Sequence, residues 1–198
     1  MNIAIIGATG KFGRLLTAKL LTKPTYHLTL ISRTVGNKFE DNHRITAKSL
    51  DATNQNDLKK ALEDADIVYC AVSGTDQPAI ARNLVELKVN RLIYMTVVGI
   101  YNELAEGNGA EFNVDNEAEQ IPNRNAAAII EDSDLDYTIF RCGYLVHGDE
   151  DEYVITKKGE SPKGYVSTIA SVEKIALEII EDSKKYSRES ISITKDMS

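Results

Sequence analysis

The sequence is poor in the residue types from which several common classes of site are built. Its 198 residues include no tryptophan, two cysteines, three histidines and four prolines. Two cysteines are too few for a disulfide scaffold and are typical of a reducing compartment, so we expect Cys70 and Cys142 to be small core thiols. The histidines have no metal-ligand spacing, and we expect no bound metal. They are His27, His43 and His147, which we expect at the surface or in loops.

Long apolar runs and an excess of positive charge are also absent. No segment approaches the roughly 18 apolar residues of a membrane span, and the first residues lack the basic region of a signal peptide. Thirty acidic against 23 basic residues give a net charge of −7, which opposes binding to nucleic-acid phosphates. We therefore expect a cytoplasmic protein with neither a membrane nor a nucleic-acid partner. The length and the 42% hydrophobic content suit one globular domain spanning residues 1–198.

The chain is organised around its first thirteen residues, which read MNIAIIGATGKFG. The apolar run from Ile3 to Ile6 is typical of a parallel strand buried on both faces. Gly7, Gly10 and Gly13 follow at three-residue spacing, and the apolar residues then take a helical period. A strand, a glycine-rich turn and a helix start form a dinucleotide-binding fingerprint, in which the turn lets a pyrophosphate approach the backbone. A glycine turn with no ligand remains the alternative.

Strands and helices alternate along the rest of the chain. Their spacing predicts a doubly wound parallel Rossmann sheet with helices on both faces, whose strand order reverses between the first and fourth strands. Expected strands are residues 27–32, 44–50, 66–72, 91–97, 136–141, 152–156 and 190–194. Expected helices are residues 11–21, 55–63, 117–133 and a helix opening near Pro78, with a last helix capped by Ser171 and ending at Glu181.

Arg33 indicates which dinucleotide the site prefers. It stands at the end of the second expected strand, where a site for NAD usually has an acid on the ribose 2′-hydroxyl. A guanidinium there can bind a 2′-phosphate in bidentate fashion, which favours NADP(H) over NAD(H). A solvated arginine at a strand end is the alternative. Asp51, after the third strand, is left open between an adenine contact and a turn or helix-start residue.

Two stretches resemble one family. GATGKFG at the start and SDLDYTIFRCGYL at residues 133–145 are similar to the small NmrA-like group of atypical short-chain dehydrogenase/reductases. The resemblance implies a single Rossmann domain with a short substrate region, here within about residues 142–170, for a small-molecule substrate. It places Cys142 where the family has a proline over the nicotinamide, and it suggests Arg141 as an anchor of that turn. The turn motif and the resemblance together give the expected cofactor-binding residues: Gly7, Thr9, Gly10, Lys11, Phe12, Gly13, Ser32, Arg33, Asp51, Ala52, Val72, Ser73, Gly74, Thr96, Val97, Cys142 and Gly143.

The catalytic residues of ordinary members are only partly represented. Thr96 stands at the place of their serine and is the candidate catalytic residue, while Glu119 and Asn123 occupy the places of their tyrosine and lysine. Tyr101 and Tyr144 are candidate replacements, although such tyrosines more often serve packing. Two functions stay open. One is an NADP(H)-dependent oxidoreductase that transfers hydride to a small quinone or carbonyl acceptor, and the other is a non-catalytic NADP(H) sensor that docks a protein partner. A nucleotide-sugar epimerase or dehydratase fits less well, because it needs the missing Tyr–Lys pair and a longer C-terminal region.

Overall fold

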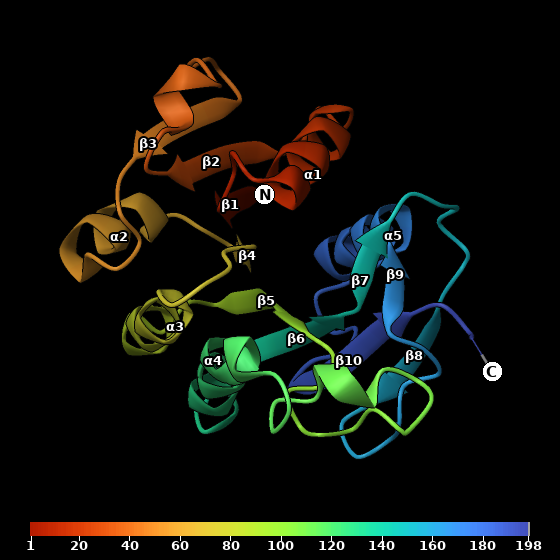
Figure 1. Ribbon diagram of the computed structural model, residues 1–198. Helices are drawn as coiled ribbons and strands as arrows, with labels where there is room; N and C mark the ends of the chain where they lie inside the picture. Colours follow the sequence, from red (N-terminus) through yellow and green to blue (C-terminus); the bar gives the residue numbers. More distant parts are fainter. Residues whose placement is uncertain (198) are drawn as a thin grey trace.

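The central sheet is built from strands that are apolar on both faces. In the computed structural model, which describes residues 1–197, every residue of β1 (Asn2–Ile6) after the first is buried. Eight strands lie in the order β3-β2-β1-β4-β5-β6-β10-β8, and of these only β8 runs antiparallel to its neighbour (Figure 1). The other strands of this sheet are β2 (His27–Ser32), β3 (Ile45–Ser49), β4 (Ile67–Cys70), β5 (Arg91–Val97), β6 (Asp136–Cys142), β8 (Val154–Lys157) and β10 (Glu189–Thr194).

The strand order reverses at β1, which pairs with β2 on one side and with β4 on the other. This is the doubly wound arrangement that the sequence predicts, and the fold prediction is confirmed. In such a sheet the ligand site lies outside the carboxyl ends of the strands, where the order reverses.

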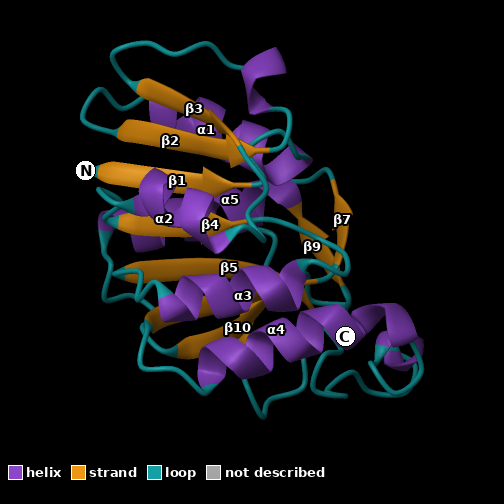
Figure 2. Cartoon of the chain, turned by 90° about the vertical axis from the view of Figure 1, so that its left-hand side faces the viewer, coloured by secondary structure: helices purple, strands orange, loops and turns teal. Residues whose placement is uncertain are grey.

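Helices cover both faces of the sheet because side chains alternate along each strand (Figure 2). Ile3 and Ile5 pack on the face covered by α1 (Lys11–Leu21) and α5 (Ile169–Glu181). Ala4 and Ile6 pack on the opposite face, which is covered by α2 (Gln55–Leu62), α3 (Gln77–Glu86) and α4 (Ile121–Glu131).

Two helix starts differ from the prediction. The last helix begins at Ile169 with Thr168 as its N-cap, so the expected cap at Ser171 is wrong. The hydroxyl of Thr168 accepts a hydrogen bond from the backbone N–H of Ser171, which places that serine inside the first turn. The helix expected over residues 117–133 divides into a 3-10 turn, Ala118–Gln120, and α4. Pro122 stands in the first turn of α4, where its missing N–H costs nothing.

A small second sheet was not predicted. β7 (Tyr144–Val146) and β9 (Val166–Thr168) pair in parallel, beside the end of β6 (Figure 1). The sequence shows no alternation there because each strand has three residues. The structure also contains 3-10 turns at Val35–Asn37 and Ala110–Phe112.

In the part of the chain that the structure describes, no helix has the length and apolar character needed to cross a membrane. Among the same residues, 1–197, no group of histidine, cysteine and carboxylate side chains is arranged to hold a metal ion. The three histidines are exposed, as expected.

Candidate cofactor and acceptor site

The three glycines of the first turn have different structural roles. Gly7 has φ +85°, and a Cβ there would lie 2.7 Å from the carbonyl oxygen of Ala71 on β4's exit. A Cβ on Gly13 would lie 2.3 Å from the carbonyl oxygen of Gly7, so this glycine lets α1 pack against the turn. A Cβ on Gly10 would meet only the Gly7 carbonyl oxygen, at 3.2 Å, within a 4 Å radius. Gly10 therefore borders open space, as a site for a pyrophosphate requires.

The start of α1 offers backbone N–H groups to that space. Gly10 is the N-cap and provides no side chain to cap the helix, and the first turn contains no acidic residue. The N–H groups of Lys11, Phe12 and Gly13 lie in the first turn, where a helix has no internal acceptors for them. Phe12 itself is buried in the core, so its contribution is the backbone N–H. This helix start fits a phosphate without a competing side chain.

A cavity of about 320 Å³ lies in front of this turn, at the carboxyl ends of β1 to β4. The structure brings together nine of the residues predicted for the cofactor, from four separate loops. They are Gly7, Thr9, Gly10, Ser32, Arg33, Asp51, Ala52, Val72 and Ser73. Gly74 follows with φ +95° and open space around its Cβ position. The lining also includes Asp76, the N-cap of α3, which the sequence did not predict as a site residue.

Hydrogen bonds fix the loop that follows β2. The Ser32 hydroxyl oxygen accepts from the Thr9 hydroxyl at 3.2 Å and from the Thr34 backbone N–H at 3.3 Å. These bonds tie the second strand's exit to the glycine turn. The side chain of Arg33 is 74% exposed at the rim, with its Nη1 atom 4.0 Å from Oδ2 of Asp76. A long, exposed guanidinium at this rim is free to meet an anionic group in the cavity.

Asp51 is both a turn residue and part of the cavity wall. Its Oδ1 atom accepts from the backbone N–H and the hydroxyl of Thr53, at 2.9 and 2.8 Å. These hydrogen bonds lower the pKa of the Asp51 carboxyl, and nearby Arg33 lowers it further. Asp51 is therefore a charged turn residue, and its contact with adenine stays a prediction.

A second, smaller cavity of about 170 Å³ lies farther along the same edge, beyond the ends of β5 and β6. Three of its lining residues, Val97, Cys142 and Gly143, were predicted for the cofactor. Its other lining residues are Val98, Phe112, Gln120, Tyr144 and Tyr165. The rings of Phe112 and Tyr165 lie 5.4 Å apart at an angle of 40°. The sequence could not show this wall, because its aromatic rings come from two irregular segments.

The structure places Thr96 inside the sheet. Its side chain is 3% exposed, and its hydroxyl donates to the carbonyl oxygen of Phe140 at 2.9 Å. Of the two cavities described, neither is lined by Thr96. The hydroxyl has one donor hydrogen, so it could donate to an acceptor only if its bond to Phe140 were broken.

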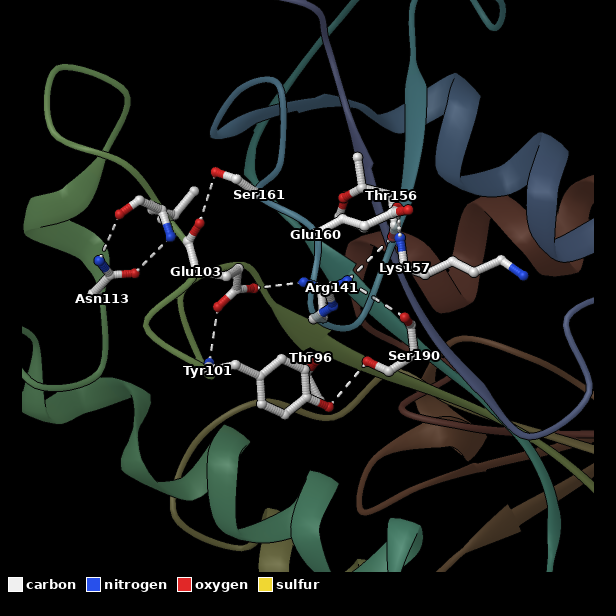
Figure 3. Close-up of polar contacts among 12 residues, drawn as sticks. Thr96, Tyr101, Glu103, Asn113, Arg141, Thr156, Lys157, Glu160, Ser161 and Ser190 are labelled. Carbon is white, nitrogen blue, oxygen red and sulfur yellow. Dashed lines mark hydrogen bonds and ion pairs between the residues drawn. The ribbon is translucent and has the colours of Figure 1, made fainter.

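Arg141 anchors a buried polar cluster close to Thr96 (Figure 3). Its guanidinium forms an ion pair with Glu103 at 2.7 Å and donates to the backbone carbonyl oxygens of Thr156 and Ser190, at 3.2 and 3.4 Å. It also lies 5.3 Å from the centroid of the Tyr101 ring. The cluster ties the loop after β5 to β6, β8 and β10, which is a wider anchoring role than the expected one.

Tyr101 belongs to this cluster rather than to either cavity. Its hydroxyl donates to the carboxylate of Glu131 at 2.8 Å and contacts the Ser190 hydroxyl at 3.0 Å. Burial raises the pKa of Tyr101, and the Glu131 charge raises it further. Tyr101 is therefore poorly suited to donate a proton near neutral pH.

The helix start at α4 has no tyrosine or lysine to serve as the usual dyad. Glu119 is exposed to solvent, whereas Gln120 reaches the smaller cavity. The Asn123 side-chain amide donates to Oε1 of Gln120 at 3.4 Å. Gln120 was missed because counting back along the chain placed its neighbour Glu119 at the tyrosine position.

The two cysteines are free and buried, as predicted. Burial raises the pKa of each thiol to about 12. Both side chains are therefore neutral at physiological pH and are unsuited to nucleophilic chemistry. Cys142 borders the smaller cavity as a small apolar group.

A glycine turn at a helix start, at the switch point of a parallel sheet, defines a dinucleotide-binding protein of the Rossmann class. Residues 7–183 match the family described as NAD(P)H-binding, and the chain belongs to that family. No curated protein was found to match the chain.

Solved structures share the fold over nearly the whole chain. A short-chain dehydrogenase/reductase from Veillonella parvula, solved in complex with NADP, is 26% identical, with a TM-score of 0.86 over 99% of this chain and 95% of its own. A Rossmann-fold NAD(P)-binding family protein from Shigella flexneri is 29% identical, with a TM-score of 0.83 over 100% and 94% of the two chains. ChuY, an anaerobillin reductase from Escherichia coli O157:H7, is 16% identical with a TM-score of 0.78 over 100% and 98%, which shows a shared fold alone.

Proposed function

We propose that the protein is an NADP(H)-dependent oxidoreductase that transfers hydride to a small quinone or carbonyl acceptor. The observation that carries this proposal is the succession of two cavities along one sheet edge. The larger has the glycine turn and Arg33, and the smaller has an apolar and aromatic wall. The NADP complex of the Veillonella parvula relative supports the choice of cofactor.

Bound NADPH would supply the hydride, and the chain's residues would orient it. The N–H groups at the start of α1 would bind the pyrophosphate, and Arg33 would bind the 2′-phosphate. Asp51, Ala52 and the Val72–Gly74 turn would border the adenosine half. Val97, Cys142 and Gly143 would border the nicotinamide ring. The short substrate region, about residues 142–170, would then supply part of the acceptor's cover through β7 and β9.

The missing Tyr–Lys dyad favours acceptors whose reduced form is a stable anion. A positioned acid contributes typically 10²–10⁴-fold to proton transfer. Without it, reduction of a ketone would have to generate an alkoxide, whereas reduction of a quinone generates a much weaker base. We therefore place quinones ahead of aldehydes and ketones as acceptors. Because Thr96 is bonded to Phe140, we assign the acceptor contact to the residues that line the smaller cavity.

Two measurements test this function. Fluorescence titration with NADPH and NADH measures the preference between cofactors. Loss of NADPH absorbance in the presence of quinones, aldehydes and ketones measures turnover and the preference between acceptors. We expect NADPH to bind more tightly than NADH and quinones to be reduced fastest. Brisk reduction of simple ketones would contradict the assignment of acceptor class.

The absent dyad also favours a second candidate, a non-catalytic NADP(H) sensor that docks a protein partner. Tight NADPH binding without turnover of any acceptor would support the sensor and overturn the oxidoreductase. A cytoplasmic location belongs to both proposals, because two free thiols suit a reducing compartment.

A further inference from the structure

We propose that the side-chain amide of Gln120 donates a hydrogen bond to the carbonyl oxygen of a planar quinone acceptor, and that Asn123 positions that amide. This inference rests on the proposed oxidoreductase function and names the acceptor-binding residues within it. Gln120 is the group that contacts substrate, and Asn123 is a positioning residue that acts through it.

Three side chains in the wall of the smaller cavity carry strong hydrogen-bond donors: Gln120 and the hydroxyls of Tyr144 and Tyr165. Val97, Val98 and Gly143 have no polar side-chain atoms, and the Cys142 thiol is a weak donor. Gln120 is the one lining residue with a side-chain amide. It is half-buried at the N-cap of α4, so the first turn of that helix fixes its position.

The Asn123 side chain contacts the oxygen of the Gln120 amide. Asn123 Nδ2 donates to Gln120 Oε1 at 3.4 Å, which occupies the acceptor end of the amide. The NH₂ end has two donor hydrogens and is left for another partner. Positions 120 and 123 are three residues apart at a helix start, the spacing at which side chains share one face.

The cavity's volume and lining favour a flat aromatic ring. Its volume of about 170 Å³ is close to that of an engineered apolar cavity of roughly 150 Å³ that binds benzene. The Phe112 and Tyr165 rings line it, and the Tyr144 side chain stands 74% exposed at its mouth. Offset or tilted packing against such rings stabilises a planar acceptor beyond the burial of its area.

An amide donor suits the reduction of a quinone better than the reduction of a ketone. A neutral amide stabilises a developing oxyanion but has no proton to give up near neutral pH. One hydride, with its two electrons, would leave the reduced nicotinamide, which becomes NADP⁺, and the quinone would become the hydroquinone monoanion. Solvent would supply the one proton that completes the hydroquinone. Hydride transfer can precede protonation in a quinone because the oxygen that carries the negative charge is a phenolate, which is a weak base.

The test compares three variants with one matched control. Gln120→Leu keeps the volume and removes the amide. Asn123→Asp should reverse the Gln120 amide. The new carboxylate would accept from Gln120 Nε2, and Gln120 Oε1, which cannot donate, would then face the quinone. Asn123→Ala removes the positioning bond alone. Asn125→Asp adds the same charge to the same helix at an exposed position and serves as the control.

We expect Gln120→Leu and Asn123→Asp to lower kcat/KM for 1,4-benzoquinone by about tenfold or more, since loss of one oxyanion donor costs up to 10²–10³-fold. Asn123→Ala should have a smaller effect, and Asn125→Asp should match the wild type. The NADPH Kd, measured by fluorescence, should stay within twofold in all four. A second readout needs no turnover: calorimetry should show hydroquinone binding to the NADP⁺ complex weakened by a similar factor in Gln120→Leu.

Each alternative result has a distinct meaning. Unchanged kcat/KM and unchanged hydroquinone affinity in Gln120→Leu would overturn the assignment of Gln120 while the oxidoreductase function stands. An equal loss in Asn125→Asp would show a general charge effect and would also overturn it. If the wild type binds NADPH but reduces no acceptor and binds no hydroquinone, both this inference and the oxidoreductase function fail.

Discussion

The Arg33 guanidinium lies 4.0 Å from the Asp76 carboxylate at the rim of the larger cavity. Both side chains are substantially exposed, at 74% and 49%, so this ion pair is weak in itself. Its importance lies in what a 2′-phosphate would meet there. With Arg33 present, the phosphate meets a cation. If Arg33 is removed, the phosphate meets the Asp76 carboxylate without a compensating cation.

Replacing Arg33 with Ala should therefore penalise NADPH far more than NADH. We expect a loss of about 1.5–3 kcal/mol in NADPH binding, the value of a charge-assisted hydrogen bond, and little change for NADH. Fluorescence titration of both cofactors measures the difference. Arg82→Ala, which removes an exposed arginine on α3, is the control. An equal loss of affinity for both cofactors would mean that Arg33 does not bind the 2′-phosphate.

Gly10→Val should abolish the binding of either cofactor and leave the protein folded. Gly10 has φ −70° and ψ 171°, which valine adopts readily, and its Cβ would meet only one atom within 4 Å. The added methyl groups would instead fill the space that the pyrophosphate needs. Circular dichroism checks that the variant is folded, and fluorescence titration checks that it binds neither cofactor. Gly36→Val, outside the cavity, is the matched control and should bind normally.

The turn itself was predictable because its determinants are local. A buried strand, three glycines and a helix start lie within thirteen residues, and the strand spacing then determines the order of the sheet. In a parallel sheet, the loops that follow the strands all lie at the same edge, so the order of the strands predicts which loops are neighbours. This is why nine of the residues predicted for the cofactor, from four loops, lie together in one cavity.

The acceptor side was not predictable in the same way. Phe112 lies in an irregular segment after β5, and Tyr165 precedes a three-residue strand. Neither segment has a periodic pattern, so nothing local indicates that their rings meet. Gln120 was missed for a related reason: a one-residue shift at the 3-10 turn decides which side chain faces the cavity. Asp76 was missed because distance along the chain hides its closeness to Arg33.

Glu103→Leu should destabilise the fold strongly. The Glu103 carboxylate pairs with Arg141, whose side chain is fully buried, and the variant would leave that guanidinium without its charge partner. Removing one partner of a buried pair typically costs about 3–5 kcal/mol. Urea unfolding followed by circular dichroism measures the loss. Glu152→Gln, which breaks an exposed pair with Lys195, should cost under about 1 kcal/mol. Similar small losses in both variants would contradict the structural role of the cluster.

The buried thiols should make the fold less stable in alkaline solution. The pKa of each is about 12 in the folded chain, above the ordinary value of 9.0, because burial disfavours the thiolate. Above pH 9 the unfolded chain therefore loses thiol protons that the folded chain keeps. The free energy of unfolding should fall by up to about 1.4 kcal/mol per pH unit for each thiol until the folded value is reached. A Cys70→Ala, Cys142→Ala double variant should show a shallower fall between pH 9 and 11. An identical slope in that variant would show that other groups cause it.

Thr96→Val tests whether this threonine acts on the acceptor or on the sheet. The hydroxyl is buried and donates to the carbonyl oxygen of Phe140, so valine would remove one donor from a buried acceptor. We expect a stability loss of about 1–3 kcal/mol and a quinone kcat/KM within about threefold of the wild type. Thr96→Ser keeps the hydroxyl and should regain most of the stability, which separates the lost bond from the change in shape. Urea unfolding and steady-state kinetics on the three proteins give both readouts. A fall in turnover of tenfold or more in Thr96→Val, at unchanged stability and reversed in Thr96→Ser, would instead place the hydroxyl at the acceptor, as the family pattern first suggested.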